Sequence, residues 1–303
     1  MKYHSIIPVI ICVLALVVIT GCAKKEADSR SIQIKGSDTE VNLVQMLAEV
    51  YMEKTPEISL AVTGGGSGVG IAALINKQTD IANSSRAMKD EEIKQAQEKG
   101  IDPIAIVFAL DGLALIAHQS LPVDRLTLDE VAKIFKGEIT NWKGLDGPDL
   151  TISLYGRQSN SGTYVYFRDK VLKGDYAPQA RRMNGNAQIV EAVKTDKAGI
   201  GYVGIGYVVD DKGQVASGIK VLNIAVGANS PAVTPLKPEN VKSGLYPLTR
   251  PLYQYTDGKP KQKLLEFIRF ELSQEGQELV TKEGYYPVTP EYMEHNRKLG
   301  LLK

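Results

Sequence analysis

The order of apolar and polar positions predicts short buried strands that alternate with amphipathic helices. The apolar runs typical of strands cover residues 32–34, 58–62, 104–108, 113–117, 151–155, 200–203, 219–224 and 252–256. Helical spacing follows the first run, with apolar residues at Val41, Val44, Leu47, Ala48 and Tyr51. Further helices are predicted from residue 71 and over 89–99, 128–135, 162–172, 261–272 and 275–282. This alternation is typical of α/β layers with largely parallel sheets.

Local signals sharpen some of these boundaries. Gly100 follows the charged helix over 89–99 and suits the position just past a helix end. Thr127 and Glu130 have the spacing of a capping box that opens the helix through Phe135. Residues 227–244 are rich in Pro, Asn and Ser, so we expect a long surface loop there.

The first residues are typical of an export signal. Lys2 precedes an apolar run over residues 6–19, which is shorter than the roughly 20 residues that a membrane span needs. The run ends in Val-Ile-Thr-Gly-Cys at residues 18–22, which resembles a bacterial lipobox. We therefore expect residues 1–21 to be a signal peptide, Cys22 to carry lipid and 22–30 to form a charged tether. The alternative is an ordinary signal peptide with a chance cysteine.

Charge and cysteine content then become more informative. The 303-residue chain has 36 Lys and Arg against 35 Asp and Glu, and removal of Lys2 makes the two counts equal. Nucleic acid is not an expected partner, because binding a phosphate backbone requires a clustered basic excess. The two cysteines are Cys12, which leaves with the signal, and Cys22, so no disulfide within the mature chain is expected. The length suggests about two domains.

Three predicted strands end in loops rich in Gly, Ser and Thr that lead into helices. These loops cover residues 36–39, 63–68 and 156–163. A strand that turns into a helix presents free backbone N–H groups at the positive end of the helix dipole, which favours a small anion. Helix capping alone would explain one such loop. Three loops, of which one has five glycines between Gly64 and Gly70 and another has Arg157, favour an anion site.

A fourth segment adds to this set. Residues 80–86 follow the second predicted helix and supply the hydroxyl of Ser85 and the charge of Arg86. A solvated surface charge is an equally good interpretation of Arg86.

Other chemistries have weaker signals. No glycine run is followed by the Lys-Ser/Thr of a P-loop, and the loose dinucleotide fingerprint at residues 68–73 does not follow the first predicted strand, which carries a different loop. A serine hydrolase needs a base, and the mature chain has only His118 and His295. No cluster has metal-ligand spacing, so neither a metal nor a cofactor is expected. Trp142 is interpreted as a packed residue at a turn.

The loop over residues 157–163 carries a resemblance to a known family. Its sequence Arg-Gln-Ser-Asn-Ser-Gly-Thr is similar to the Arg-x-x-x-Ser-Gly-Thr anion loop of the phosphate-binding proteins of bacterial phosphate ABC transporters. The loops at 36–39 and 66–68 also resemble that family, as do the phrases at 134–142 and 199–204. The phrase at 272–277 occurs among related solute receptors as well. The resemblance covers residues 31 to about 288.

The resemblance implies a two-lobed, type II periplasmic-binding-protein fold with two mostly parallel sheets. Two strands would cross a hinge near residues 109–113 and 246–251. Lobe one would then contain residues 31–110 and 250–303, and lobe two residues 111–249. The phosphate-binding residues implied are Ser37, Asp38, Thr39, Ser67, Ser85, Arg86, Arg157, Ser161, Gly162 and Thr163.

One departure from the family pattern concerns selectivity. Family members carry an aspartate where this chain has Ser85, and a threonine about where Asp38 stands. The aspartate accepts a hydrogen bond from protonated phosphate and so rejects sulfate, which has no proton to donate near neutral pH. We hypothesise that Asp38 has taken the acceptor role and that Ser85 is a donor. The alternative is that Asp38 only caps the following helix.

The expected function is therefore that of a receptor and not of an enzyme. An exported, lipid-anchored monomer facing the periplasm or the exterior would capture inorganic phosphate and deliver it to the membrane permease of an ABC transporter. Sulfate, molybdate and tungstate remain alternative ligands. An exported phosphoester hydrolase would use the same loops, but the missing base and metal ligands disfavour it.

Overall fold

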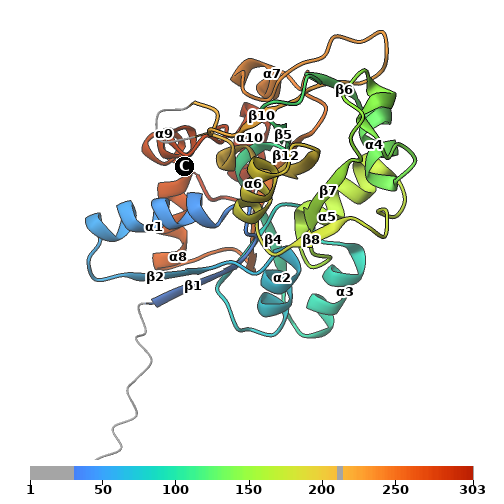
Figure 1. Cartoon of the computed structure of the whole chain (residues 1–303). Coiled ribbons are helices and arrows are strands. Elements are labelled where there is room, and N and C mark those ends of the chain that lie inside the picture. Colours follow the sequence, from blue (N-terminus) through green and yellow to red (C-terminus); the bar gives the residue numbers. More distant parts are fainter. Residues whose placement is uncertain (1–30, 210–213, 303) are drawn as a thin grey trace, which may run out of the picture.

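The computed structural model describes residues 31–209 and 214–302, which form two α/β lobes joined side by side (Figure 1). The predicted signal peptide, Cys22 and the tether lie outside the described residues. Within the described part, no helix is long and apolar enough to cross a membrane.

The first lobe is built on a five-stranded sheet with the order β2-β1-β3-β12-β4. Its strands are β1 (Ser31–Gly36), β2 (Ser59–Thr63), β3 (Ile81–Ser84), β4 (Pro103–Gly112) and β12 (Thr249–Asp257). β1 pairs in parallel with β2 and β3, whereas β12 pairs antiparallel with β3 and β4. The carboxyl ends of β1, β2 and β3 therefore meet at one edge of the sheet.

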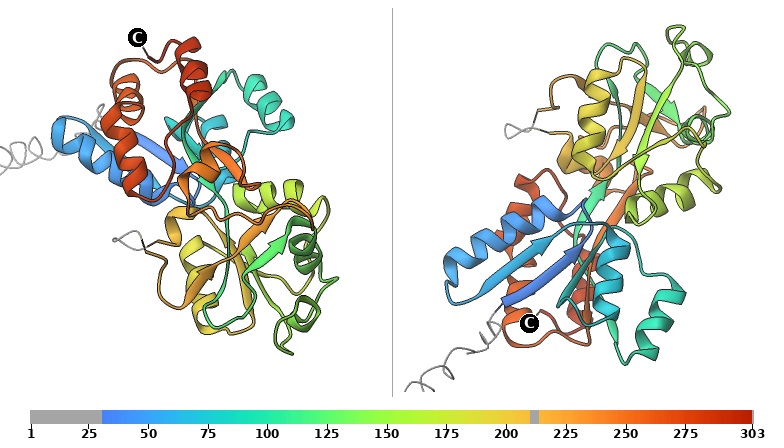
Figure 2. Two further views of the ribbon diagram at one scale, coloured as in Figure 1. Left: turned by 90° about the horizontal axis from the view of Figure 1, so that it is seen from above. Right: turned by 60° about the horizontal axis from the view of Figure 1, so that its bottom comes forward.

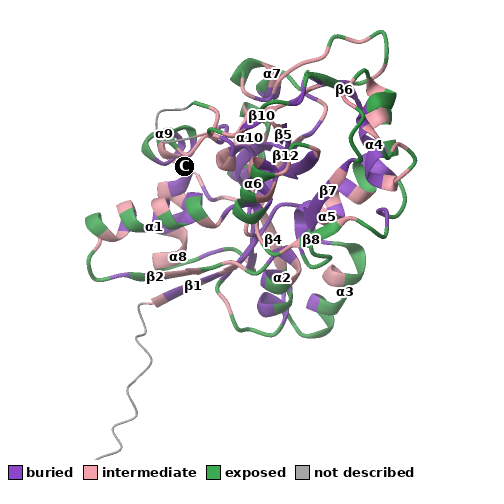
Figure 3. Cartoon of the chain, in the orientation of Figure 1, coloured by how far each residue is buried: buried purple, intermediate pink, exposed green. Residues whose placement is uncertain are grey.

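Helices cover both faces of this sheet (Figure 2). They are α1 (Val41–Lys54), α2 (Ser67–Ile75), α3 (Asp90–Glu98), α8 (Gln262–Glu271), α9 (Gln274–Lys282) and α10 (Pro290–Lys298). Successive strand residues point to opposite faces, so Ile81 packs in the core with α1 and α8, while Ala82 packs in the core with α2 and α3. Along α1 and α2, buried positions alternate with exposed and half-buried ones (Figure 3).

The second lobe has a five-stranded sheet with the order β10-β5-β9-β7-β8 and a separate pair, β11-β6. Its strands are β5 (Ala114–His118), β6 (Arg125–Thr127), β7 (Ser153–Arg157), β8 (Arg181–Met183), β9 (Gly199–Val203), β10 (Ile219–Val221) and β11 (Asn223–Ala225). Its helices are α4 (Leu128–Lys136), α5 (Gly162–Phe167), α6 (Asn186–Thr195) and α7 (Pro238–Lys242), with a π-helical turn over Arg168–Leu172 and 3-10 turns over Trp142–Leu145 and Ile205–Tyr207.

Aromatic rings anchor the loop that follows β7. Tyr202 of β9 stacks on Phe167 with 4.2 Å between ring centroids, and Phe167 meets Phe135 edge-on at 5.0 Å. The Tyr202 hydroxyl accepts the backbone N–H of Arg157 at 3.1 Å. The packed core of the second lobe thus fixes the position at which the Arg157 side chain leaves the sheet.

Both sheets are mixed, but four of the five strands in each run in the same direction, so the prediction of mostly parallel sheets is confirmed. In the second sheet β7 pairs in parallel with β8 and β9, but β5 is antiparallel to both β9 and β10. In the first sheet the reversed strand is β12, which brings the chain back through the hinge beside β4.

Several local predictions are confirmed and others are wrong. Thr127 and Glu130 form the predicted capping box, and Trp142 is fully buried. The single strand expected over 219–224 breaks at Leu222, because β10 pairs with β5 and β11 with β6. The expected loop over 227–244 contains α7 and a bridge from Val233 to Ile224. The helices α6 and α10 were not predicted.

Two chain segments connect the lobes. β4 and β12 pair antiparallel up to Gly112 and Thr249, and the backbone N–H of Leu113 then donates to Leu248 at 3.0 Å. This pair lies within the crossings predicted near 109–113 and 246–251. The lobe limits themselves remain a prediction.

A carboxyl group is completely buried where the first sheet meets α1. Glu40 is the N-cap residue of α1 and has an exposed fraction of 0%. Burial raises its pKa well above the ordinary value, although the Ser37 hydroxyl and the charge of Arg250 act in the opposite direction. The folded protein therefore favours the neutral form of this side chain.

We expect the substitution Glu40→Gln to make stability less sensitive to rising pH. Folding raises the pKa of Glu40, so the stability that depends on its neutral form is fully present below the unfolded pKa and is lost as pH rises toward the folded pKa. Urea unfolding at about pH 4 and about pH 8 measures this loss. The free energy of unfolding should fall less in the variant than in the wild type. Glu49→Gln, at an exposed position of the same helix, is the control. If the free energy of unfolding falls equally in Glu40→Gln and in the wild type, the expectation is wrong.

Candidate anion-binding site

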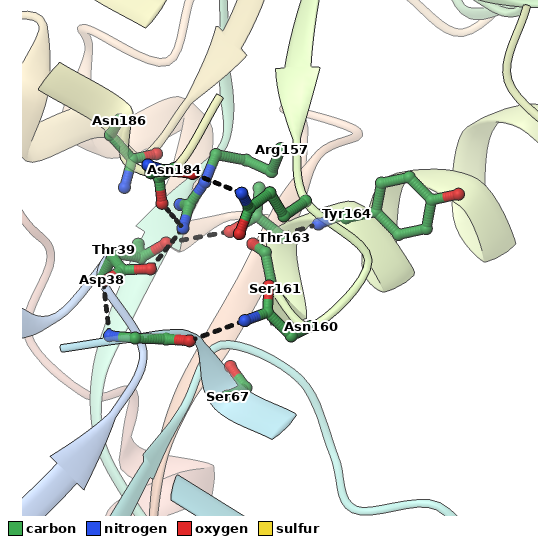
Figure 4. A network of polar contacts seen from close by, with 12 residues as sticks. Asp38, Thr39, Ser67, Arg157, Asn160, Ser161, Thr163, Tyr164, Asn184 and Asn186 are labelled. Atoms are coloured by element: carbon green, nitrogen blue, oxygen red, sulfur yellow. Dashed lines mark hydrogen bonds and ion pairs between the residues drawn. The ribbon is translucent and has the colours of Figure 1, made fainter. Parts of the chain in front are cut away.

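The predicted loops meet where the two lobes face each other. The segments after β1, β2 and β3 come from the first lobe, and the segment after β7 comes from the second. Ligands of α/β sheets bind outside the carboxyl ends of strands, and these loops occupy that position. Figure 4 shows Asp38, Arg157, Ser161 and Thr163 gathered there, with Ser67 close by.

Four buried hydroxyl groups from both lobes lie in contact. The Thr39 and Thr163 hydroxyls are 2.9 Å apart, and the Ser85 hydroxyl is 3.4 Å from that of Thr163. Ser67 accepts the backbone N–H of Ser85 at 3.1 Å, and its oxygen lies 3.4 Å from the Ser85 hydroxyl. A hydroxyl has one donor and two acceptor positions. This cluster can therefore turn donors toward a bound anion.

Gly162 is required for this approach of the loops. A Cβ atom at this position would lie 2.2 Å from the Ser67 hydroxyl and 2.7 Å from the Ser85 hydroxyl. Any side chain would therefore occupy the space of the hydroxyl cluster. Ser161 precedes Gly162 as the N-cap of α5, where its hydroxyl accepts the N–H of Tyr164 at 3.4 Å.

Arg157 brings a buried positive charge into the site. Its exposed fraction is 2%, and its Nη2 donates to the Asp38 carboxylate and, at 3.0 Å, to the Asn184 carbonyl. Nε and Nη1 are buried and have no hydrogen-bond partner among the described residues. An unsatisfied buried donor costs about 1–3 kcal/mol, and more when it is charged. These N–H groups are therefore suited to an acceptor that is not part of the chain.

Asp38 connects the two lobes. One carboxylate oxygen accepts the backbone N–H of Gly65 at 2.7 Å, and the other accepts from Arg157. α1 begins at Val41, and its N-cap, Glu40, makes no side-chain capping bond. The interpretation of Asp38 as a helix cap is therefore wrong, because its carboxylate is turned away from α1 toward the glycine loop and Arg157.

Ser37 and Arg86 were predicted to bind phosphate but are not among the contacting hydroxyls of the site. Ser37 is buried beside Glu40 at the end of β1. The guanidinium of Arg86 donates to both oxygens of Glu92 at 2.6 and 2.7 Å and to the Ala87 carbonyl at 2.8 Å. Burial raises the pKa of Glu92, but the hydrogen bonds from Arg86 and the Lys89 backbone lower it overall. The structure does not bring Arg86 into contact with the hydroxyl cluster.

A buried ion pair that was not predicted from the sequence lies directly behind the hydroxyls. Arg250 in β12 donates to Asp111 in β4 through Nε at 2.9 Å and Nη2 at 2.7 Å. Nη2 also donates to the Thr163 hydroxyl at 3.0 Å. One signal was available, since Asp111 is the single charge in the apolar run from Ile104 to Ala117.

Direct contacts hold the lobes in a closed arrangement. The Asn160 side chain donates to the Gly65 carbonyl at 2.9 Å, and the Asn160 carbonyl accepts the N–H of Gly68 at 3.0 Å. The Tyr207 hydroxyl donates to the Asp38 carbonyl at 2.6 Å. We name the Asn160 contacts with Gly65 and Gly68 the Asn160 clasp. In residues 31–209 and 214–302 no group of His, Cys, Asp and Glu is placed to hold a metal ion.

Comparison with known proteins agrees with this geometry. The model of the PBP superfamily domain matches residues 23–275. The phosphate-binding protein PstS of Pseudomonas aeruginosa is 33% identical over 297 residues, which cover 92% of this chain and 90% of that protein. PstS of Bacillus subtilis is 31% identical over 271 residues, covering 88% and 83%. This chain belongs to the PstS family of phosphate-binding proteins.

Solved structures of the PstS type have the same fold. A structure described as a phosphate ABC transporter substrate-binding protein of Clostridium perfringens with bound phosphate has a TM-score of 0.75 and 30% identity, covering 86% of this chain and all of that one. An ABC-type phosphate transport receptor of Vibrio cholerae has a TM-score of 0.67 and 29% identity, covering 85% and 100%. The predicted two-lobed binding-protein fold is confirmed. The PstS family consists of transport receptors and not of enzymes.

Proposed function

We propose that this chain captures inorganic phosphate between its lobes and delivers it to the membrane permease of an ABC transporter. One observation carries the proposal: the buried Arg157 has two unpartnered nitrogens within a group of loops that also supplies buried Ser and Thr hydroxyls. A tetrahedral oxyanion has acceptor oxygens on every side, so it can use all of these donors together. The PstS relatives support phosphate as the ligand.

The charges of the site support recognition through local donors. Arg157 is paired with Asp38, and Arg250 is paired with Asp111. Each positive charge is thus balanced before an anion arrives. The equal numbers of acidic and basic residues in the predicted mature chain lead to the same view, because no general positive field would attract anions. Fixed hydroxyl and N–H donors would provide the binding energy.

Asp38 would provide selectivity for phosphate over sulfate. Each of its carboxylate oxygens accepts one described hydrogen bond, from Gly65 or from Arg157. A carboxylate has about four acceptor positions, so capacity remains for the proton of hydrogen phosphate. Sulfate would place a bare oxygen against this carboxylate, which costs free energy in a dry site. Ser85 would act as a donor in this arrangement.

Closure of the two lobes would bury the ligand. We place lobe one at residues 31–110 and 250–303 and lobe two at 111–249, with the hinge at β4 and β12. A bound anion that touches Arg157 from one lobe and Ser67 from the other favours the closed state, because only that state makes both contacts. The hydrogen bonds of the Asn160 clasp would stabilise the same closed state.

Export and anchoring complete the proposal. The apolar run over residues 6–19 and the lipobox-like ending at Cys22 support a lipoprotein held at the outer face of the cell membrane. We propose that the charged tether over 22–30 separates the first lobe from that membrane. The receptor would act as a monomer.

The selectivity proposal is tested by calorimetry with phosphate and with sulfate. We expect the wild type to bind phosphate at least about 100-fold more tightly than sulfate, because the proton acceptor rejects the unprotonated ion. Asp38→Asn should reduce this ratio about tenfold or more, since an amide can donate to sulfate. Asp129→Asn, at an exposed position of α4, is the control. An unchanged ratio of phosphate to sulfate affinity in Asp38→Asn would show that another group accepts the phosphate proton.

The closure proposal is tested with two neighbouring glycines. Both have positive φ, +97° for Gly66 and +118° for Gly65. A Cβ at Gly66 would lie 2.8 Å from the Asn160 carbonyl of the other lobe, whereas one at Gly65 would meet only Val69 at 3.6 Å. Gly66→Ala should therefore weaken phosphate binding and increase the radius of gyration in saturating phosphate. Gly65→Ala also places a side chain at positive φ and is the control, and identical behaviour of the two variants would refute the closure argument.

The anchor is tested by fractionating bacteria that express the protein. Cys22→Ser should move the protein from the membrane fraction to the soluble exported fraction, because the lipid acceptor is removed. Cys12→Ser is the matched control and should leave the protein with the membrane. If Cys22→Ser stays in the membrane fraction, lipid at Cys22 is not the anchor.

A further inference from the structure

We infer that Arg250 is a positioning residue that turns the free hydroxyl proton of the Thr39–Thr163 pair toward the bound anion. This inference rests on the proposed function, because it assigns the direction of one hydroxyl donor in the phosphate site. Arg250 lies behind the hydroxyls, on the hinge strand β12, and its exposed fraction is 1%. It lies outside all three anion loops.

The contacts of Arg250 reach both lobes. Its Nη1 donates to the Ser85 carbonyl at 3.1 Å in the first lobe. Its Nη2 donates at 3.0 Å to the Thr163 hydroxyl in the second lobe and lies 3.5 Å from the Thr39 hydroxyl. The guanidinium also lies over the Tyr166 ring, with 5.2 Å to the ring centroid. One rigid, planar group thus fixes hydroxyls that belong to different lobes.

Counting protons gives the direction of the hydroxyls. Thr39 and Thr163 together have two hydroxyl protons, and their oxygens are 2.9 Å apart, so one proton lies between them. Arg250 has no acceptor, and its N–H groups occupy the lone pairs on its own side. The second proton therefore points away from Arg250. The side of Thr163 away from Arg250 faces the Ser85 hydroxyl and the rest of the hydroxyl cluster.

The positive charge of Arg250 strengthens this effect. A hydroxyl that accepts from a charged donor becomes a better donor itself, because chains of hydrogen bonds polarise one another. Without Arg250, the threonine hydroxyls could rotate and turn lone pairs toward the anion. The result would be repulsion at the position where a donor is required.

Asp111 keeps Arg250 in this orientation. One carboxylate oxygen accepts from Nε and Nη2 of Arg250, and the other accepts the backbone N–H of Ile205 at 2.9 Å. Asp111 has an exposed fraction of 0%. Its two oxygens thus connect the guanidinium to a turn of the second lobe, which couples the hydroxyl orientation to lobe closure.

The test is a double-mutant cycle on phosphate affinity, measured by calorimetry on the purified full-length protein. Arg250→Lys keeps the charge next to Asp111 but cannot reproduce the planar contacts with Thr163 and Ser85. Thr163→Val removes the hydroxyl. Each single variant should weaken phosphate binding about tenfold or more. The double variant should be no weaker than the worse single variant, because both changes remove the same oriented donor.

Two controls separate positioning from a general structural effect. Ser161→Ala removes a hydroxyl of the site that has no described contact with Arg250. The fold-loss of phosphate affinity in this variant should therefore multiply with the fold-loss in Arg250→Lys. Thr163→Ser retains a hydroxyl at the same place and should restore most of the affinity. If Arg250→Lys does not fold, Arg250→Gln combined with Asp111→Asn replaces it, since removing both charges leaves no buried ion unpaired.

The outcomes distinguish this inference from the proposed function. If the wild type binds phosphate and the losses of Arg250→Lys and Thr163→Val multiply, Arg250 does not act through Thr163 and the inference is wrong. The proposed function would be unaffected by that result. If the wild type binds no phosphate, the proposed function fails and the inference fails with it.

Discussion

The architecture of the site depends on the requirement that a buried charge must have a fixed partner. Arg157 and Arg250 are both almost completely removed from solvent. Removing one partner of such a pair costs about 3–5 kcal/mol, because it leaves an isolated charge in a medium of low polarity. Asp38 and Asp111 are those partners, and each pair joins segments that are far apart in the sequence. The loops of the two lobes therefore cannot separate without changing the surroundings of a charge.

The general fold could be predicted because its signals are local. Ile32 and Ile34 alternate with polar residues in β1, and Leu43, Leu47 and Tyr51 recur on one side of α1. These patterns depend only on the repeat of each element. The directions of the reversed strands β12 and β5 could not be predicted in the same way. They depend on where the chain crosses the hinge, which is a property of the whole topology and not of a strand.

The loop residues of the site could be predicted from the sequence, but the contacts between distant residues could not. Loops after strands carry recognisable Gly, Ser and Thr patterns, so Thr39, Ser67 and Thr163 were found. Arg250 was not found, because it lies within a strand, one residue after its start, and contacts hydroxyls 87 and 211 residues away in the sequence. Arg86, by contrast, was predicted as a site residue but does not contact the hydroxyl cluster. It has the expected position and charge, but the sequence could not show that Glu92, six residues later, binds both of its terminal nitrogens.

The strand order of the first sheet has a consequence for how the molecule can be assembled. β12 lies between β3 and β4, and it is the only strand of that sheet with which β4 pairs. The chain enters the second lobe after Gly112 and returns at Thr249, which lies 137 positions later in the sequence. Closing a loop of this length is entropically costly before any contact compensates for it. The second lobe can fold from one continuous stretch, whereas the first must wait for the end of the chain to insert its missing strand.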